Sequence, residues 1–187
     1  MIFNFMTFKR LIGLAVISVF ISGCATLNEA ECISANWYDL GSENALSGKK
    51  SSFVAEHTSA CKKYQITPDF DLYREGWQQG IKQFCSAQSG WRYGIAGNYY
   101  RNTCDTQAQA EFLKGYNPAR KIVQKKREIS DLKSDARRLR ESIVKDKLTD
   151  KEQASITLDH LDVRLDLQLL ELELFQLESR ARENGFY

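Results

Sequence analysis

The chain has 187 residues, a length that suits one compact domain or a smaller domain with an extension. It carries 26 Lys and Arg against 24 Asp and Glu, so its formal net charge at pH 7 is only +2. A nearly neutral chain has no long-range attraction for a polyanion, so we expect no nucleic-acid partner.

The first residues have the layout of an exported lipoprotein. Lys9 and Arg10 precede an apolar run over 11–21 that is shorter than the about 20 residues of a membrane-spanning helix. Ile21-Ser22-Gly23-Cys24 then resembles a lipobox. We expect residues 1–23 to be a lipoprotein signal peptide and Cys24 to be lipidated. An ordinary signal peptide followed by a chance cysteine is the alternative.

Lipidation at Cys24 predicts where the protein lies. Several acyl chains anchor stably where one is marginal, since each buried CH₂ contributes about 0.8 kcal/mol. Ala25 and Thr26 follow Cys24, and a lipoprotein without Asp at this point is, by analogy, sorted to the outer membrane of Gram-negative bacteria. We expect a lipid-anchored outer-membrane protein that faces the periplasm, with residues 24–35 as anchor and tether. Without residues 1–23, basic and acidic residues are equal in number.

Four further cysteines are expected to form two disulfides, since an exported protein meets an oxidising compartment. They are Cys32, Cys61, Cys85 and Cys104. A metal site is the alternative, but the chain has no Cys-x-x-Cys pair and only His57 lies near these cysteines, so we expect no metal. We also expect no cofactor.

Residues 36–116 are expected to form a small helical domain, rich in cysteine and glycine. One helix is predicted from Trp37 to about Ser47, and a second, capped by Ser51 or Ser52, to about Tyr64. A third is predicted from Thr67-Pro68-Asp69 to about Cys85, with Thr67 as N-cap and Pro68 at the first helical position.

Helix lengths suggest how the cysteines pair. If the first two helices are antiparallel and turn near Lys49, Cys32 and Cys61 lie at the same end. Cys85 lies at the far end of the third helix, roughly 24 Å from the turn at Ile66–Thr67 that precedes it. This distance is too long for a bridge to Cys61, since bridged Cα atoms lie within about 7 Å. We therefore favour Cys32–Cys61 and Cys85–Cys104, although sequence alone does not determine connectivity. The second bridge would close residues 90–103, which we expect to be too rich in glycine to hold a helix unaided.

An aromatic residue followed three positions later by glycine recurs along this domain. Since glycine in a helix interior costs about 1 kcal/mol relative to alanine, close helix packing should offset that cost. We interpret the glycines as packing grooves for aromatic rings of neighbouring helices, because no polar constellation supports a ligand groove. The pairs are Tyr38/Gly41, Tyr73/Gly76, Trp91/Gly94 and Phe112/Gly115.

Residues 117–187 are predicted to form a long antiparallel helical hairpin that resembles a coiled coil. A helix from Thr106 to about Tyr116 is expected to be followed by a new or kinked segment at Asn117-Pro118, and Thr149-x-x-Glu152 is expected to cap the last helix. Apolar residues recur every seven positions. They are Ile122, Ile129, Ala136, Ile143, Leu132 and Leu139 before the turn. After it they are Ile156, Val163, Leu170, Leu177, Leu167, Leu174 and Ala181, with His160 as the one polar member of these rows. The predicted fold class is therefore all-α: a small disulfide-stapled helical domain followed by this hairpin.

The last helix carries a second apolar stripe, formed by Leu158, Leu161, Leu165 and Leu172. The alternation over 161–169 also has strand periodicity, but the residue types favour a helix. An apolar face this wide has more to bury than one hairpin partner covers. We expect it to contact either the cysteine-rich domain, an envelope protein or a second copy of the chain.

No catalytic signature occurs, so we expect no enzyme. His57 and Cys61 have the spacing with which an imidazole activates a thiolate, but an oxidised Cys61 is no nucleophile. His160 lies on an apolar row and is expected to be a core or interface residue. A different class of function is glycan binding, with rings stacked on sugars of peptidoglycan. The candidate rings are Trp91, Tyr93, Tyr99 and Tyr100, for which we prefer a role in the core.

The region 37–104 resembles an uncharacterised family of Gram-negative lipoproteins, domain-of-unknown-function family 2799. The matching elements are Trp37 with Gly41 and Gly48, His57-x-x-x-Cys61, Pro68-Asp69-x-x-x-Tyr73-x-x-Gly76-x-x-x-Gly80-x-x-x-x-Cys85, and Gly94-x-x-Gly97-x-x-Tyr100 with Cys104. The resemblance implies location and domain limits, but no activity. Our leading hypothesis is a non-enzymatic interaction or scaffold module in the cell envelope.

Overall fold

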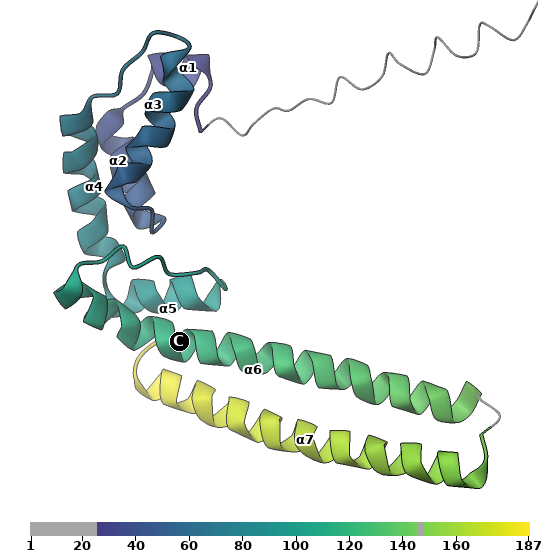
Figure 1. The fold of residues 1–187 in the computed structure, drawn as a ribbon. Helices are drawn as coiled ribbons and strands as arrows, with labels where there is room; N and C mark the ends of the chain where they lie inside the picture. The colour runs from purple at the N-terminus through teal and green to yellow at the C-terminus, as the bar shows by residue number, and fades with distance from the viewer. Residues whose placement is uncertain (1–25, 146–147) are drawn as a thin grey trace, which may run out of the picture. The chain divides into compact units, whose positions relative to one another are not determined.

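The computed structural model describes residues 26–145 and 148–187, and every regular element in these ranges is helical (Figure 1). The predicted signal peptide and Cys24 lie outside the described residues. The all-α fold class, with two disulfides and a long antiparallel helix pair, is confirmed. The elements are α1 (Glu29–Ile33), α2 (Trp37–Leu46), the 3₁₀ turn η1 (Ser51–Phe53), α3 (Val54–Lys62), α4 (Phe70–Phe84), α5 (Ala87–Ile95), α6 (Thr106–Lys145) and α7 (Asp150–Glu183). Among the described helices, none combines the length and the apolar character that a membrane span requires.

The described residues form two compact units. The first consists of residues 26–35 and Val54–Pro68, and the second of Asn36–Phe53 and Asp69–Tyr187. In the first unit, a disulfide joins Cys32 of α1 to Cys61 of α3, with 5.7 Å between their Cα atoms. The segment expected to be only a tether therefore contains a helix. Asn28 and Glu31 start it as a capping box, which satisfies backbone N–H groups at its first turn.

The third predicted helix, α4, begins later than expected. Asp69, and not Thr67, is its N-cap: the Asp69 carboxylate accepts hydrogen bonds from the backbone N–H groups of Asp71 and Leu72, at 3.1 and 3.0 Å. A carboxylate at this position also interacts favourably with the positive end of the helix dipole. The prediction of Thr67 as N-cap is wrong because a better acceptor follows two residues later.

In the second unit, α2 packs against α4 through glycines on both helices. A Cβ atom added at Gly41 would lie 2.0 Å from the Tyr73 carbonyl oxygen, and one at Gly76 would lie 1.8 Å from that of Tyr38. The absence of a side chain at Gly41 thus lets the backbone at Tyr73 come close, and the absence of one at Gly76 does the same for the backbone at Tyr38. The partner of α2 in this unit is therefore α4, whereas the sequence analysis had paired the first helix with the second.

The helices α5 and α6 repeat this arrangement. A Cβ at Gly90 would lie 2.0 Å from the Phe112 carbonyl oxygen, and one at Gly115 would lie 1.9 Å from that of Ala87. The first part of residues 90–103 is helical, because Gly90 and Gly94 lie inside α5. The segment was expected not to hold a helix unaided, and α6 is what supports it. Close packing on α6 compensates for the low helix propensity of these glycines. The interpretation of the glycines as packing grooves is confirmed in both helix pairs, but the backbone of the partner helix, and not an aromatic ring, lies closest to Gly41, Gly76, Gly90 and Gly115.

An aromatic cluster joins the end of α4 to the start of α6. The Phe112 ring is fully buried and lies 4.8 Å from the Phe84 ring and 4.5 Å from the Tyr100 ring, centroid to centroid. The disulfide between Cys85 and Cys104 lies in the same cluster. Both disulfides thus have the pairing favoured from helix lengths.

Helix α6 continues through the predicted domain boundary. It runs from Thr106 to Lys145 with Pro118 in its interior, so the alternative of a new helix at Asn117-Pro118 is wrong. An interior proline costs about 3 kcal/mol. Packing on both sides of it offsets that cost: Gly115 and Ala119 contact α5, and Ala119 and Ile122 are fully buried.

The hairpin is formed by α6 and α7, which lie side by side (Figure 1). Ion pairs connect the two helices at Lys125–Glu173 (2.9 Å), Lys126–Glu178 (2.8 Å) and Lys133–Glu171 (2.8 Å). Hydrogen bonds from Lys125 to Glu128 and Glu173 raise the pKa of the Lys125 ammonium. The predicted capping box at the start of α7 is confirmed, with Thr149 as N-cap and the Glu152 carboxylate accepting a hydrogen bond from the Thr149 backbone N–H.

Candidate interaction surface

The helix α7 has two apolar faces. The rows predicted to form the hairpin seam are half-buried or buried against α6, and Ala181 at their end is only 2% exposed. The second stripe lies on the opposite side of α7, since a helix advances 100° per residue. Its four predicted residues, Leu158, Leu161, Leu165 and Leu172, are 63, 49, 59 and 55% exposed. The four leucines predicted to form the second stripe are thus side chains that the hairpin leaves uncovered.

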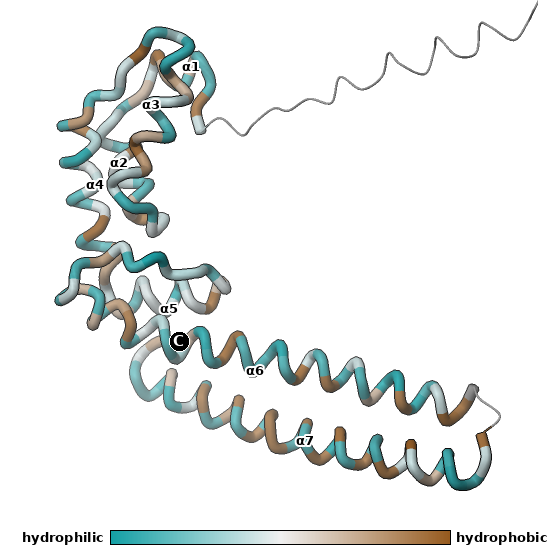
Figure 2. The backbone as a smooth tube through the Cα atoms, viewed as in Figure 1, coloured by the Kyte–Doolittle hydropathy of each residue, from teal (hydrophilic) through white to brown (hydrophobic). Residues whose placement is uncertain are grey.

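This exposed side is longer than the four predicted residues. Leu169 and Phe175 belong to it and are equally exposed, but the sequence analysis did not include them. For Phe175 the missed signal was the alternation of spacings of three and four, which continues past Leu172; for Leu169 it was the spacing of four from Leu165 and three to Leu172. We call these six side chains the leucine face: Leu158, Leu161, Leu165, Leu169, Leu172 and Phe175. Figure 2 shows hydrophobic residues recurring along the whole of α7.

Charged residues border the leucine face without interrupting it. The other residues on this side of the helix between Ala154 and Ser179 are small or uncharged polar ones. Along one border lie Asp159, Asp162 and Asp166, none of which takes part in an ion pair among the described residues. The opposite border carries both signs of charge. It includes Arg164 and Glu171, and the Glu171 carboxylate forms an ion pair with Lys133 of α6.

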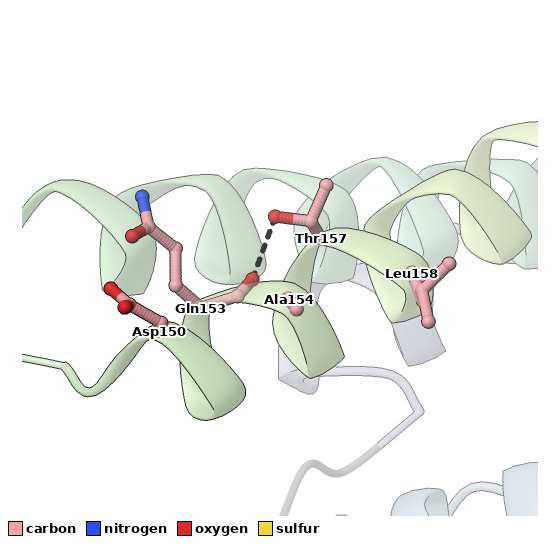
Figure 3. Close-up of a pocket in the computed structure, with 5 residues that line it drawn as sticks. All are labelled: Asp150, Gln153, Ala154, Thr157 and Leu158. Atoms are coloured by element: carbon pink, nitrogen blue, oxygen red, sulfur yellow. Dashed lines mark hydrogen bonds between the residues drawn. The ribbon is translucent and has the colours of Figure 1, made fainter.

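A shallow hollow lies at the start of the leucine face, in the first turns of α7 (Figure 3). Asp150, Gln153, Ala154, Thr157 and Leu158 line it. The Thr157 hydroxyl donates a hydrogen bond of 2.7 Å to the Gln153 carbonyl oxygen, so this polar group is already satisfied within the helix. The hollow is open, and its polar lining residues Asp150, Gln153 and Thr157 are exposed to solvent, which favours a feature of the surface over an enclosed small-molecule site.

The four rings considered for glycan contact do not form one exposed platform. Trp91 is 6% exposed and stacks on Phe186 near the end of the chain, at 5.2 Å between centroids. Tyr100 is 8% exposed, and burial raises the pKa of its hydroxyl. Tyr93 is half-buried and its ring meets Phe84 edge-on. Only Tyr99 of the four is well exposed, at 78%, so most of this set fills the core.

The His57–Cys61 pair is not available for nucleophilic chemistry. Cys61 is bonded to Cys32, and His57 is buried with its Nδ1 atom 3.0 Å from the Thr26 hydroxyl oxygen. His160 is half-buried in the seam of the hairpin, as expected. In residues 26–145 and 148–187, no three His, Cys, Asp or Glu side chains gather as a metal site would require.

These features define an all-helical protein in which a disulfide-bonded unit and two glycine-packed helix pairs precede a charged hairpin with an exposed leucine face. Residues 36–121 match the family described as "Protein of unknown function (DUF2799)". The matched region contains α2, α4, α5 and the first part of α6, with the glycines that pack them, and leaves most of the hairpin outside it.

The chain is also similar to the uncharacterized protein YfiL of Escherichia coli (strain K12). The two are 26% identical over 101 residues, which are 52% of this chain and 78% of the E. coli protein. No solved structure shows a significant match. The comparisons thus agree with the resemblance of the region 37–104 to this uncharacterised family.

Proposed function

We propose that the protein is a non-enzymatic lipoprotein of the outer membrane whose hairpin docks a partner in the cell envelope through the leucine face. The observation that carries the proposal is the exposure of six large apolar side chains in a row on α7. Monomeric soluble proteins rarely expose contiguous apolar patches larger than roughly a few hundred Å², and larger ones usually mark interaction sites.

The packing of α6 against α7 supports such a role, because it keeps α7 helical and its outer side exposed. The seam rows of α7 are half-buried or buried on the opposite side, and three ion pairs between α6 and α7 favour one register of the two helices. The leucine face is therefore presented on a helix that stays formed without a partner. A surface that is already ordered does not have to be ordered on binding, which lowers the entropic cost of association.

The lipid anchor is tested by replacing the acceptor thiol. We expect the Cys24→Ser chain to leave the membrane fraction, because serine cannot form the thioether that carries the diacylglyceryl group. Metabolic labelling of cells with a fatty acid, followed by cell fractionation, measures this loss. The Cys85→Ser, Cys104→Ser chain is the matched control, since it removes cysteines but keeps the lipobox. Labelling of the Cys24→Ser chain at the level of the parent would contradict the proposal.

The docking role is tested in cells with a photo-crosslinking residue at position 165, in the middle of the leucine face. We expect crosslinks to a defined envelope protein or to a second copy, and their loss when Leu161→Asp and Leu172→Asp are combined. The same probe at Asp131, exposed on α6, is the control and should give none of these products. Absence of crosslinks at 165, together with retention of the chain on purified peptidoglycan, would favour the glycan-binding alternative.

A further inference from the structure

Five residues of the leucine face, together with Gln168 in place of Leu169, have the spacing of a second coiled-coil seam. Leu158, Leu161, Leu165, Gln168, Leu172 and Phe175 follow one another at alternating intervals of three and four residues. In heptad terms Leu158, Leu165 and Leu172 occupy the a positions, and the other three occupy d positions. The face spans about 26 Å at 1.5 Å per residue, which is long enough for a helix of another chain to lie along it.

We propose that this seam pairs with the same seam of a second copy, with the two α7 helices antiparallel about a two-fold axis between Asp166 and Leu167. This inference rests on the proposed docking role and names the partner. A two-fold interface uses one patch on both subunits, so the patch must be complementary to itself. The order of residues along α7 meets this condition, as the layers of the pairing show.

In this register every layer of the seam joins an a position to a d position. Leu158 lies opposite Phe175 of the second copy, and Leu161 lies opposite Leu172. At the centre, Leu165 lies opposite Gln168, and the symmetry repeats each contact. The largest side chain thus meets a leucine, and the two glutamines lie in neighbouring layers near the axis.

The charges beside the seam favour the same register. In an antiparallel pair of identical helices, the residues before the a positions face one another across the seam. Arg164 then lies opposite Glu171 of the second copy, twice by symmetry. On the other border, Asp162 lies opposite Leu169, so it meets no like charge. Asp159 and Asp166 follow a positions and point outward from the contact.

Other registers lack this match. A shift of one heptad in one direction places Arg164 opposite Arg164 of the second copy, and the opposite shift places Glu171 opposite Glu171. A parallel pair brings Arg164 next to Leu169 and joins no opposite charges across the seam. Since charges at these positions set partner choice and orientation in coiled coils, the antiparallel register is the one that the sequence of α7 selects.

The test is a charge exchange in the full chain, extracted in detergent and studied by sedimentation velocity over a range of concentrations. We expect the parent chain to sediment as a dimer. Arg164→Glu alone should weaken the dimer at least tenfold, because it places acidic groups opposite each other at two points. Combining Arg164→Glu with Glu171→Arg should restore the parent affinity. Arg180→Glu, on the same helix but outside the contact, should leave the dimer unchanged.

Two results would overturn this inference. One is a parent chain that is monomeric at every concentration, and the other is a combined variant as weak as Arg164→Glu. Circular dichroism of each variant checks that the helices persist, since Glu171→Arg also removes the exposed ion pair with Lys133. If the chain is monomeric but position 165 still crosslinks to a different envelope protein, the docking role stands and only self-pairing fails.

Discussion

Replacing Gly76 by alanine should destabilise the second unit by about 3 kcal/mol or more, the upper end of the usual cost of overpacking. The added Cβ would lie 1.8 Å from the Tyr38 carbonyl oxygen, and the obstruction is backbone, which cannot rotate away. Helix propensity alone predicts the opposite sign, a gain of about 1 kcal/mol. Urea unfolding followed by circular dichroism, with the disulfides intact, measures the difference.

Two further variants make the Gly76→Ala result specific. Gln79→Ala changes an exposed residue of the same helix, and we expect its effect to stay within about 0.5 kcal/mol. Gly115→Ala places a Cβ 1.9 Å from the Ala87 carbonyl oxygen in the other helix pair, so it should be as damaging as Gly76→Ala. A Gly76→Ala chain more stable than the parent would show that α2 and α4 do not pack in this way.

Long periodic patterns in the sequence predicted the hairpin well. The rows that contain Ile122 and Leu174 repeat over several heptads, and a pattern of that length has few structural solutions other than a helix pair. The glycine motifs were also interpreted correctly as packing sites. Their partners were not identified, because a glycine in the sequence reveals that something approaches closely but not which segment does.

Predictions that depended on a single segment were less successful. Helix α5 was not predicted, because residues 90–103 are too rich in glycine to hold a helix unaided and the sequence does not reveal that α6 supplies the packing for Gly90 and Gly94. The proline at 118 looked like a boundary for the same reason. In both places, contacts with residues distant in the sequence outweigh the local preference.

The candidate surface was predicted in part. Four leucines of the face followed from helical spacing, and Phe175 continues that spacing past Leu172. Leu169 lies at the edge of the face, four residues after Leu165 and three before Leu172. The aromatic rings considered for glycan contact were harder to place from the sequence. Trp91 and Tyr100 stack on Phe186 and Phe112, and these partners cannot be inferred from the local sequence.

The largest local effect should come from removing the disulfide between Cys32 and Cys61. The described part of the first unit has 25 residues, and units below about 40 residues usually need a disulfide, a metal or a partner to stay folded. The bridge joins residues 29 positions apart, a loop whose closure contributes roughly 3.5 kcal/mol in the chain-entropy model. We therefore expect the Cys32→Ser, Cys61→Ser chain to lose α1 and α3 while α4 to α7 persist.

Hydrogen exchange measured by mass spectrometry separates this local loss from global unfolding. Amides of residues 54–62 should lose their protection, while those of α6 and α7 should exchange as in the parent. The contrasting variant is Cys85→Ser with Cys104→Ser, because that bridge lies among Phe84, Tyr100 and Phe112. These rings remain packed without it, so the variant should lower the unfolding midpoint without exposing a single segment. Unchanged protection in α3 after loss of Cys32–Cys61 would mean that apolar packing alone holds the first unit together.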